Sequence, residues 1–256
     1  QMNGTSGYEE AAAQGLIAGV NASRYNKNQD PLVLGRDEAY MGVLIDDLIT
    51  KDTAEPYRMF TSRAEYRLLL RYSNADIRLL DKAKSFGLIK SSFYRALHNK
   101  LELTKQTIKG LSGSLSKEEV VGLFPNLKKN TVPHVAPAKF FLKRPEVSIK
   151  SMPKRYFSVL ENSTISSHWA REVLFEVETQ IKYEGYIKRQ RNQVARMLKQ
   201  ESVSIPPDLN YSKINTISLE AREKLQLVRP ETLGQAFRVS GVTPADISVL
   251  SVLLYK

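Results

Sequence analysis

The sequence has no cysteine, only three histidines and a single tryptophan. The lack of cysteine excludes disulfides, thiolate catalysis and cysteine-ligated zinc within these residues, and it fits an intracellular protein. His98, His134 and His168 lack the spacing of metal ligands, so we expect no metal site. No stretch approaches the ~18 consecutive apolar residues of a membrane span. The polar residues at the start do not resemble a signal peptide either, so we expect no membrane partner.

Complete catalytic motifs are also missing. The sequence holds no Walker phosphate-binding loop and no nucleophile–base set. The adjacent carboxylates Asp46 and Asp47 suggest a metal or acid–base pair, but neighbouring positions on a helix point about 100° apart. We therefore interpret them as capping or salt-bridge groups that do not share one site, and we expect no catalytic residue in this chain.

Positive charge is abundant. Lysine and arginine outnumber the acids 38 to 27, which gives a net charge of +11 over 256 residues. Such an excess favours a polyanionic partner, most commonly nucleic acid. A basic protein whose lysines are only solvated is the alternative. No basic amphipathic segment of the kind that binds membrane surfaces stands out.

A glycine-rich turn at the N-terminus leads directly into an alanine-rich helix. Gly4 and Gly7 allow the backbone to approach a ligand closely or to take a positive φ. The free N–H groups that open such a helix also form a ready anion site. Small residues cover most of the helix up to Ala22, and such a surface fits only where something large packs against it. A tightly packed helix without a ligand is the alternative.

Most of the chain has the apolar periodicity of helices. Apolar and boundary residues predict helices at 43–49, 92–108, 165–200, 218–228, 232–239 and 243–254. A glycine inside a helix costs ~1 kcal/mol relative to alanine, so Gly185 predicts a close contact between helices. The proline-rich segment 132–155 is expected to be an extended connector whose cations track a phosphate backbone. A solvated basic loop is the alternative there.

Two basic segments are candidates for RNA contact. Between residues 55 and 71, four arginines alternate with aromatic residues, and the second half of the predicted helix 165–200 is rich in lysine and arginine. Arginine forks suit phosphates and aromatic rings stack on bases. From local charge, the candidate RNA-binding residues are Arg58, Arg63, Arg67, Lys188, Arg189 and Arg191. Alternatively, the arginines of the first segment pair with Glu55, Glu65 and Asp76 in a buried network.

The C-terminal helices also have the outline of a helix-turn-helix. This outline covers residues 233–254 and raises sequence-specific DNA binding as a rival function. The would-be recognition helix after Thr243 has no Arg, Lys, Asn or Gln to read base edges, and Asp246 at its start would face phosphate.

Residues 1–22 closely resemble the signature that ends the FAD-binding domain of the MnmG/GidA family, the large subunit of a tRNA uridine 5-carboxymethylaminomethyl modification enzyme. Residues 55–79, 183–190, 229–236 and 240–245 also resemble motifs of this family. The resemblance implies a mainly α-helical fold, in which the remnant of a Rossmann-type FAD-binding domain precedes a helical bundle. Residues 1–75 would form the end of the FAD-binding domain and a connecting segment. Residues 76–256 would form the helical C-terminal domain, with 211–256 as a terminal helical subdomain.

The resemblance also implies a function. Together with a GTPase partner of the MnmE family, such a protein modifies carbon 5 of the wobble uridine of tRNA. It uses FAD, NADH and methylenetetrahydrofolate, acts as a homodimer, and lies in the cytoplasm or, in a eukaryote, the mitochondrion. The helical domain would be the docking surface for tRNA and the GTPase.

The same resemblance places Gln1 at an FAD contact, with Asn3, Gly4 and Thr5 on the same loop. Gly7 completes the set of candidate cofactor-binding residues. Because the pyrophosphate site of the family lies in the domain that precedes this segment, we expect no stable FAD binding by this chain alone. A free-standing basic RNA-binding helical module is the alternative function.

Overall fold

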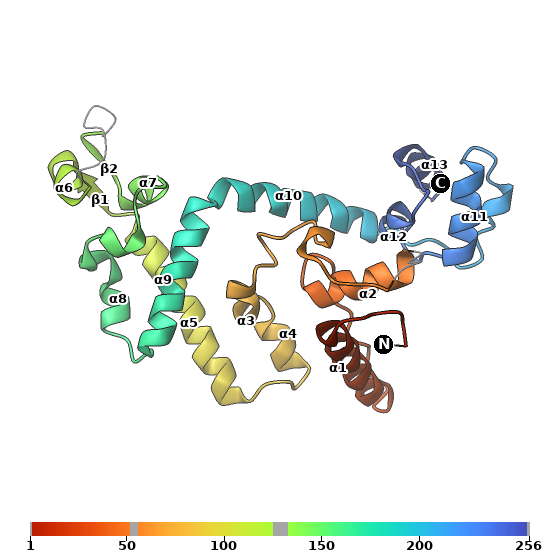
Figure 1. The fold of residues 1–256 in the computed structure, drawn as a ribbon, viewed down its shortest axis with the longest axis horizontal. Helices are drawn as coiled ribbons and strands as arrows, with labels where there is room; N and C mark the ends of the chain where they lie inside the picture. The colour runs from red at the N-terminus through yellow and green to blue at the C-terminus, as the bar shows by residue number, and fades with distance from the viewer. Residues whose placement is uncertain (1, 52–55, 125–132, 255–256) are drawn as a thin grey trace. The chain divides into compact units, whose positions relative to one another are not determined.

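The computed structural model describes residues 2–51, 56–124 and 133–254 (Figure 1). It is mainly α-helical, which confirms the predicted fold class. The helices are α1 (Tyr8–Tyr25), α2 (Tyr40–Thr50), α3 (Ala75–Arg78), α4 (Leu80–Ser85), α5 (Ser91–Gly110), α6 (Lys117–Leu123), α7 (Ala138–Leu142), α8 (Ser158–Glu161), α9 (Ser167–Lys182), α10 (Glu184–Glu201), α11 (Leu219–Val228), α12 (Leu233–Arg238) and α13 (Pro244–Leu254). Short 3₁₀ turns lie at Thr61–Arg63, Tyr72–Asn74, Ile149–Ser151, Lys154–Phe157 and Tyr211–Lys213. Strands β1 (Ser114–Ser116) and β2 (Val135–Pro137) pair antiparallel, with Leu115 opposite Ala136.

The chain forms two compact units. Residues 1–70 and 189–256 form the first unit, and residues 71–188 form the second. One boundary between the units therefore lies between the loop residues Leu70 and Arg71, and the other lies inside α10, between Lys188 and Arg189. The expected domain division into 1–75 and 76–256 stays a prediction.

Helix α1 begins at Tyr8 as expected and exposes most of its surface. It contacts α2, beside which it lies in Figure 1, and its only buried residue is Glu10. One face consists of exposed small residues and a leucine: Ala12, Gly15, Leu16, Gly19 and Ala22. A Cβ atom added at Gly15 or Gly19 would meet no atom within 4 Å. No described residue therefore covers this face of small side chains.

The middle of the first unit is a small apolar core. Val43 on α2 packs with Ala64, Tyr66 and Leu70. The face of α10 that carries Val194 and Met197 covers this core, and the backbone N–H of Leu69 donates to Gln190 Oε1 at 3.1 Å.

The last helices of the first unit form a bundle, as expected for the C-terminal region. Helices α11, α12 and α13 surround a core that includes Tyr211, Leu225 and Leu250. The hydroxyl groups of Ser218 and Thr232 cap α11 and α12. The predicted start of the last helix is confirmed, because Thr243 and Asp246 exchange capping hydrogen bonds at the beginning of α13.

Asp246 links two helix starts in this bundle. Its Oδ1 accepts the backbone N–H of Ser218 at 2.8 Å, and its Oδ2 accepts the N–H and hydroxyl of Thr243 at 2.9 and 2.6 Å. Burial alone would raise the pKa of Asp246, but the hydrogen bonds from Thr243 and Ser218 outweigh it and lower the pKa.

The variant Asp246→Asn should lower the free energy of unfolding by about 1–3 kcal/mol near pH 7, because its amide nitrogen cannot accept both bonds from Thr243. A carboxyl group whose pKa is lower in the folded state stabilises the protein at pH values above its unfolded-state pKa. This stabilisation is lost as the pH falls through the folded-state pKa. In urea titrations, the difference from wild type should therefore shrink below about pH 4. The exposed Asp208→Asn is the control and should change little at either pH. An Asp246→Asn deficit equally large at pH 3 would contradict the expectation.

The second unit has the larger core. Helices α5 and α9 pack together, and the core includes Leu111, Leu115, Phe141, Val173 and Val177. The expected extended connector at 132–155 is wrong for the described residues 133–155. That segment contains β2, α7 and two 3₁₀ turns. The apolar residues between its prolines are buried, and Pro137 and Pro153 occupy N-cap positions that suit the fixed φ of proline.

The predicted helix 165–200 is two helices. Helix α9 ends at Lys182, Tyr183 takes φ −101° and ψ 14°, and α10 begins at Glu184. The close contact predicted at Gly185 is wrong, because an added Cβ would meet nothing within 4 Å. In the first turn of α10 this glycine weakens helix propensity next to the break instead of making room for a neighbour.

Candidate cofactor loop and nucleic-acid interface

The N-terminal loop is held against residues that follow α2. Gly4 has a positive φ of 78°, and its carbonyl accepts the N–H of Tyr57 at 2.7 Å. The N–H of Ser6 donates to the carbonyl of Tyr57 at 3.2 Å. From α1, Gln14 accepts the amide of Asn3 at 2.8 Å and donates to the hydroxyl of Thr5 at 3.0 Å. Hydrogen bonds within the chain therefore define the conformation of the loop.

The candidate cofactor-binding residues fall into two groups. Asn3 and Gly4 are exposed, whereas Thr5 and Gly7 are buried, and the Thr5 hydroxyl already accepts a bond from Gln14. Gln1 lies outside the described residues. Asn3 and Gly4 are thus placed to meet a ligand, and Thr5 and Gly7 shape the loop. Their assignment to a cofactor stays a prediction.

The carboxylate of Glu10 occupies the N-terminal end of α1. Oε1 accepts the N–H of Met59 at 2.7 Å, and a Cβ on Gly7 would lie 1.8 Å from Oε2. Hydrogen bonds from the N–H of Met59, then from the N–H of Glu10 itself, lower the pKa of this carboxyl. A phosphate would meet this fixed negative charge. The loop therefore fits an uncharged polar part of a cofactor, such as a flavin ring, and does not fit a pyrophosphate at the start of α1.

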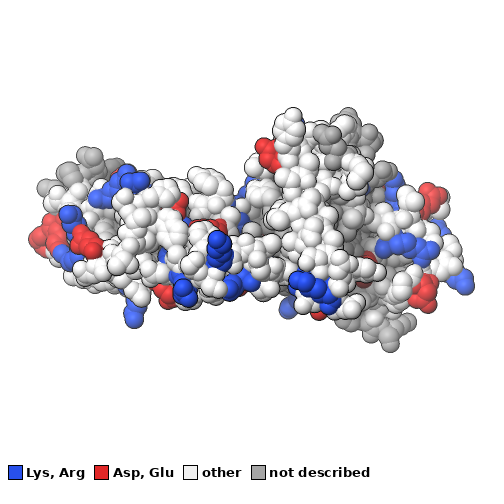
Figure 2. All heavy atoms as spheres, turned by 90° about the horizontal axis from the view of Figure 1, so that it is seen from below, with Lys and Arg blue, Asp and Glu red and all other residues white. Residues whose placement is uncertain are grey.

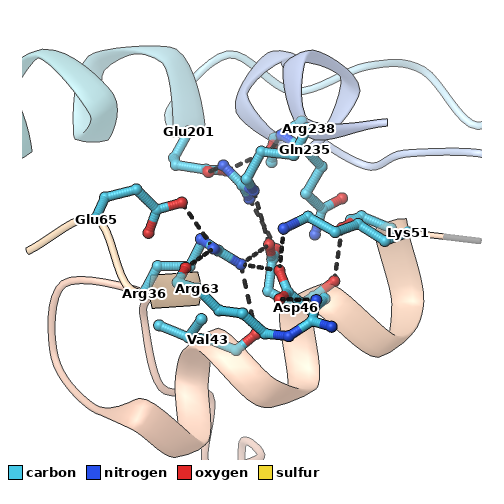
Figure 3. Close-up of polar contacts among 12 residues, drawn as sticks. Arg36, Val43, Asp46, Lys51, Arg63, Glu65, Glu201, Gln235 and Arg238 are labelled. Carbon is cyan, nitrogen blue, oxygen red and sulfur yellow. Dashed lines mark hydrogen bonds and ion pairs between the residues drawn. The ribbon is translucent and has the colours of Figure 1, made fainter. Parts of the chain in front are cut away.

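A cluster of charged side chains centres on Arg36, whose own side chain is 3% exposed (Figure 3). Nη1 lies 2.9 Å from Asp46 Oδ2 and 2.6 Å from Asp47 Oδ1, and Nη2 lies 2.7 Å from Glu65 Oε1. The interpretation of Asp46 and Asp47 as salt-bridge groups is confirmed. The expectation that they would not share one site is wrong. Although the two side chains point in different directions from α2, both carboxylates contact the same nitrogen, Nη1 of Arg36.

Asp47 is the most buried member of this cluster, with a fully buried side chain. Oδ1 also pairs with Lys51 Nζ at 2.7 Å, and Oδ2 accepts the hydroxyl of Tyr57 at 2.9 Å. Burial would raise the pKa of Asp47, but the hydrogen bonds from Lys51 and Arg36 lower it. Burial, together with the charge of Asp47, raises the pKa of Tyr57. Both pKa values move away from neutrality, so the cluster suits a structural role better than proton transfer.

Arg238 joins the C-terminal bundle to this cluster. Its Nε and Nη2 lie 2.7 and 2.8 Å from the two oxygens of Asp46, which is 192 residues away in the sequence. Nη1 pairs with Glu201 at the end of α10. We call Arg36, Asp46, Asp47, Glu65, Glu201 and Arg238 the Arg36 cluster. Sequence reasoning missed Arg36 and Arg238, since neither belongs to a charge run and no local spacing links them.

The first group of candidate RNA-binding residues lies near this cluster. Arg58 is 54% exposed and lies 3.7 Å from Glu10 Oε1. Arg63 donates to the carbonyl of Arg58 at 2.8 Å and lies over the ring of Tyr57, 4.3 Å from its centroid. Arg67 is exposed. Arg58 and Arg67 therefore present charge to solvent, while Arg63 mainly packs against its neighbours.

Among the described residues, two of the carboxylates expected in the alternative network have other cations as partners. Glu65 pairs with Arg36, and Asp76 pairs with Lys100 at 2.7 Å. Arg71 pairs instead with the buried Glu176 of α9. Glu55 lies outside the described residues.

A second basic surface lies in the second unit where α9 ends. Lys143 Nζ pairs with Glu184 at 2.6 Å, and this bond, with the charges of Lys143, Lys139 and Lys188, lowers the pKa of Glu184. The exposed rings of Tyr183 and Tyr186 lie 6.3 Å apart. We call Lys139, Lys143, Tyr183, Tyr186 and Lys188 the basic–aromatic patch. Cations beside exposed aromatic rings suit an RNA strand, because phosphates and bases find partners side by side.

Further cations lie on the part of α10 that belongs to the first unit. Arg189 and Arg191 are exposed, and Arg196 and Lys199 are also exposed on the half of the helix that faces away from Val194 and Met197. On the face drawn in Figure 2, the lysines and arginines lie in small groups separated by uncharged side chains. The assignment of Arg58, Arg63, Arg67, Lys188, Arg189 and Arg191 to RNA stays a prediction.

Comparison with known proteins gives three matches to models of one family. Residues 193–256 match the tRNA modifying enzyme MnmG/GidA C-terminal helical bundle, and residues 91–191 match the MnmG/GidA C-terminal helical domain. Residues 1–30 match glucose inhibited division protein A. The chain belongs to the MnmG/GidA family.

Relatives within the MnmG/GidA family align with nearly the whole chain. The tRNA uridine 5-carboxymethylaminomethyl modification enzyme MnmG of Lactobacillus delbrueckii subsp. bulgaricus is 48% identical over 255 residues, which are 98% of this chain and 39% of the relative. The enzyme of the same name from Bacillus cereus is 48% identical over 99% of this chain and 40% of its own length. The chain thus spans about two fifths of the length of these relatives.

A solved MnmG/GidA structure has the same fold. The GidA structure of Aquifex aeolicus in the form II crystal matches with a TM-score of 0.79 and 37% identity, over 99% of this chain and 39% of that chain. Across the described parts of the chain, no helix is long and apolar enough to cross a membrane. Nor do residues 2–51, 56–124 and 133–254 hold a group of three or more potential metal-ligating side chains.

Proposed function

We propose that this chain is part of an FAD-dependent tRNA-modifying enzyme. With a GTPase partner of the MnmE family, the full-length protein adds a carboxymethylaminomethyl group at carbon 5 of the wobble uridine. One observation carries the proposal: enzymes named for this modification are 48% identical to the chain over 98% of its length. NADH and methylenetetrahydrofolate are the co-substrates, and the full-length protein is a homodimer in the cytoplasm or the mitochondrion.

The N-terminal loop contributes to the cofactor site of the full-length protein. FAD supplies the redox chemistry when it is bound. Asn3 and Gly4 hold an uncharged part of the cofactor, and Glu10 keeps phosphate away from the start of α1. The bare small-residue face of α1 supports this role, because small side chains allow a neighbouring domain to pack closely.

The basic surfaces position the tRNA. Arg58 and Arg67 in the first unit and the cations at the start of α10 contact phosphates, while Tyr183 and Tyr186 stack on bases. The C-terminal bundle docks the GTPase partner through exposed apolar side chains on α11 and α13. These side chains are Leu219, Leu227 and Val252.

Binding of tRNA by the 256-residue chain should fall steeply with salt. If about five phosphates are contacted, the affinity should drop by roughly 100-fold to 500-fold between 50 and 200 mM salt, because bound counterions are released on association. A filter-binding titration measures this. An affinity that stays flat over this range would contradict a tRNA-binding role.

A flavin spectrum of the full-length protein tests the enzyme against its alternatives. The purified full-length protein should be yellow, whereas the 256-residue chain should not retain FAD through gel filtration. A colourless full-length protein that still binds tRNA would favour a free-standing RNA-binding module. The DNA-binding alternative has little support, because Asp246 is committed to capping and α13 offers no Arg, Lys, Asn or Gln to read base edges.

A further inference from the structure

A cavity of about 500 Å³ in the second unit has no role in the function proposed so far. It lies between the 3₁₀ turn at Tyr72–Asn74, α5 and α9. Two aromatic side chains from different elements line it: Tyr72, which is 88% exposed, and Phe175, which is 54% exposed. Large rings this exposed at the edge of a cavity are suited to stack on a planar ligand.

The interior of this cavity presents carboxylates held in place by a buried cation. Lys100 is 2% exposed, and its Nζ donates to Asp76 Oδ2 at 2.7 Å and to Glu172 Oε2 at 2.6 Å. Burial alone would lower the pKa of Lys100, but these two bonds raise it, so the amine stays charged. Both carboxylates remain partly exposed. Because each carboxylate oxygen accepts more than one hydrogen bond, both retain capacity for a ligand's donors.

An arginine and a histidine lie at the same cavity. Arg171 is exposed and lines it. His168 also lines it, with Nε2 3.1 Å from Glu172 Oε1. The cavity therefore combines stacking surfaces, hydrogen-bond acceptors and a cation, which are the three kinds of group that bind an unpaired nucleotide.

We propose that this cavity binds an unpaired guanine of an RNA strand. The base stacks on Tyr72 and Phe175, its N1–H and amino group donate to Glu172, and Arg171 contacts the adjoining phosphate. Guanine is favoured because its Watson–Crick edge carries two adjacent donors that match a carboxylate. Uracil has one donor between two carbonyl oxygens, which a carboxylate repels. The proposal rests on the RNA-binding role proposed above.

Trp169 reports binding at this cavity. It is the only tryptophan in the sequence, and its ring centroid lies 5.8 Å from Lys100 Nζ. We would titrate the 256-residue chain with a six-nucleotide RNA that contains one guanine among uridines, and with an all-uridine RNA of the same length. The guanine RNA should change the fluorescence of Trp169 saturably and bind at least about fivefold more tightly.

Variants separate stacking from base recognition. Tyr72→Ala and Phe175→Ala should each weaken binding of the guanine RNA by roughly tenfold, because each removes a stacking face. Glu172→Gln should abolish the preference for guanine over uridine while binding of the all-uridine RNA persists. The matched control is Tyr25→Ala, which removes an equally exposed ring from α1 and should change neither affinity.

The outcomes distinguish this proposal from the RNA-binding role on which it rests. Equal affinity for the two RNAs, or wild-type affinity in Tyr72→Ala, would overturn the guanine site even if tRNA binding stays salt-dependent. Guanine-dependent quenching in a chain that does not bind tRNA would instead contradict the proposed function and leave the cavity assignment standing.

Discussion

Replacing Arg36 by methionine should lower the free energy of unfolding of the first unit by about 3 kcal/mol, because the fully buried Asp47 loses its nearest guanidinium and keeps only Lys51 and the more distant Arg63 as cationic partners. Glu65 and Asp46 would also lose ion pairs, although Arg238 still neutralises Asp46. The cost comes mainly from the weaker charge compensation of a buried carboxylate, and the net contribution of the intact cluster relative to apolar residues is much smaller.

Urea titrations followed by circular dichroism measure this loss, and the fluorescence of Trp169 follows the second unit separately. The Arg36→Met variant should shift the dichroism transition to lower urea and leave the Trp169 transition in place. Arg58→Met is the matched control, since the exposed Arg58 has one carboxylate at 3.7 Å, and it should cost less than about 1 kcal/mol.

A second substitution tests the cause of the loss. Adding Asp47→Asn to Arg36→Met removes the buried negative charge and should restore part of the lost stability. If the Asp47→Asn change instead destabilises the Arg36→Met variant as much as it destabilises the wild type, weaker compensation of the Asp47 charge is not the cause of the loss.

Removing the cations at the start of α10 should have the largest effect on RNA binding. The triple variant Lys188→Gln, Arg189→Gln and Arg191→Gln should weaken tRNA binding roughly 100-fold at about 0.1 M salt. It should also lower the salt slope by about 2 to 3, because each lost phosphate contact removes close to one released counterion.

A matched variant on another helix controls for net charge. Arg95, Lys105 and Lys109 are exposed cations on α5, and replacing all three by glutamine removes the same charge. This control should weaken binding by severalfold at most, through the long-range field alone. Equal losses in the two triple variants would mean that total charge, and not the position of α10, governs tRNA affinity.

The helical class and several helix boundaries followed from local patterns. Thr243, Pro244 and Asp246 specify the start of α13 through side-chain and backbone hydrogen bonds that span only three residues. The glycine turn before α1 was likewise recognisable. Gly4 can take its positive φ because it has no Cβ atom, whatever its neighbours are. The family resemblance rested on the same kind of local motif.

Local patterns failed where neighbouring elements compete. The proline-rich segment forms short helices and a strand because Phe141, Leu142 and Val147 are buried in the core of the second unit. The break between α9 and α10 at Tyr183 is a separate case, since Gly185 was the only residue in the sequence that weakly indicated it.

The helical class and the helix caps follow from residues a few positions apart in the sequence, and the excess of positive charge follows from its composition. Only the tertiary structure decided that Asp46 and Asp47 share Arg36 and that Arg238 reaches Asp46 from 192 residues away. It also decided which cations remain exposed. A buried ion pair forms only when packing brings distant groups together and excludes water, and nothing in the spacing of residues along the chain records that.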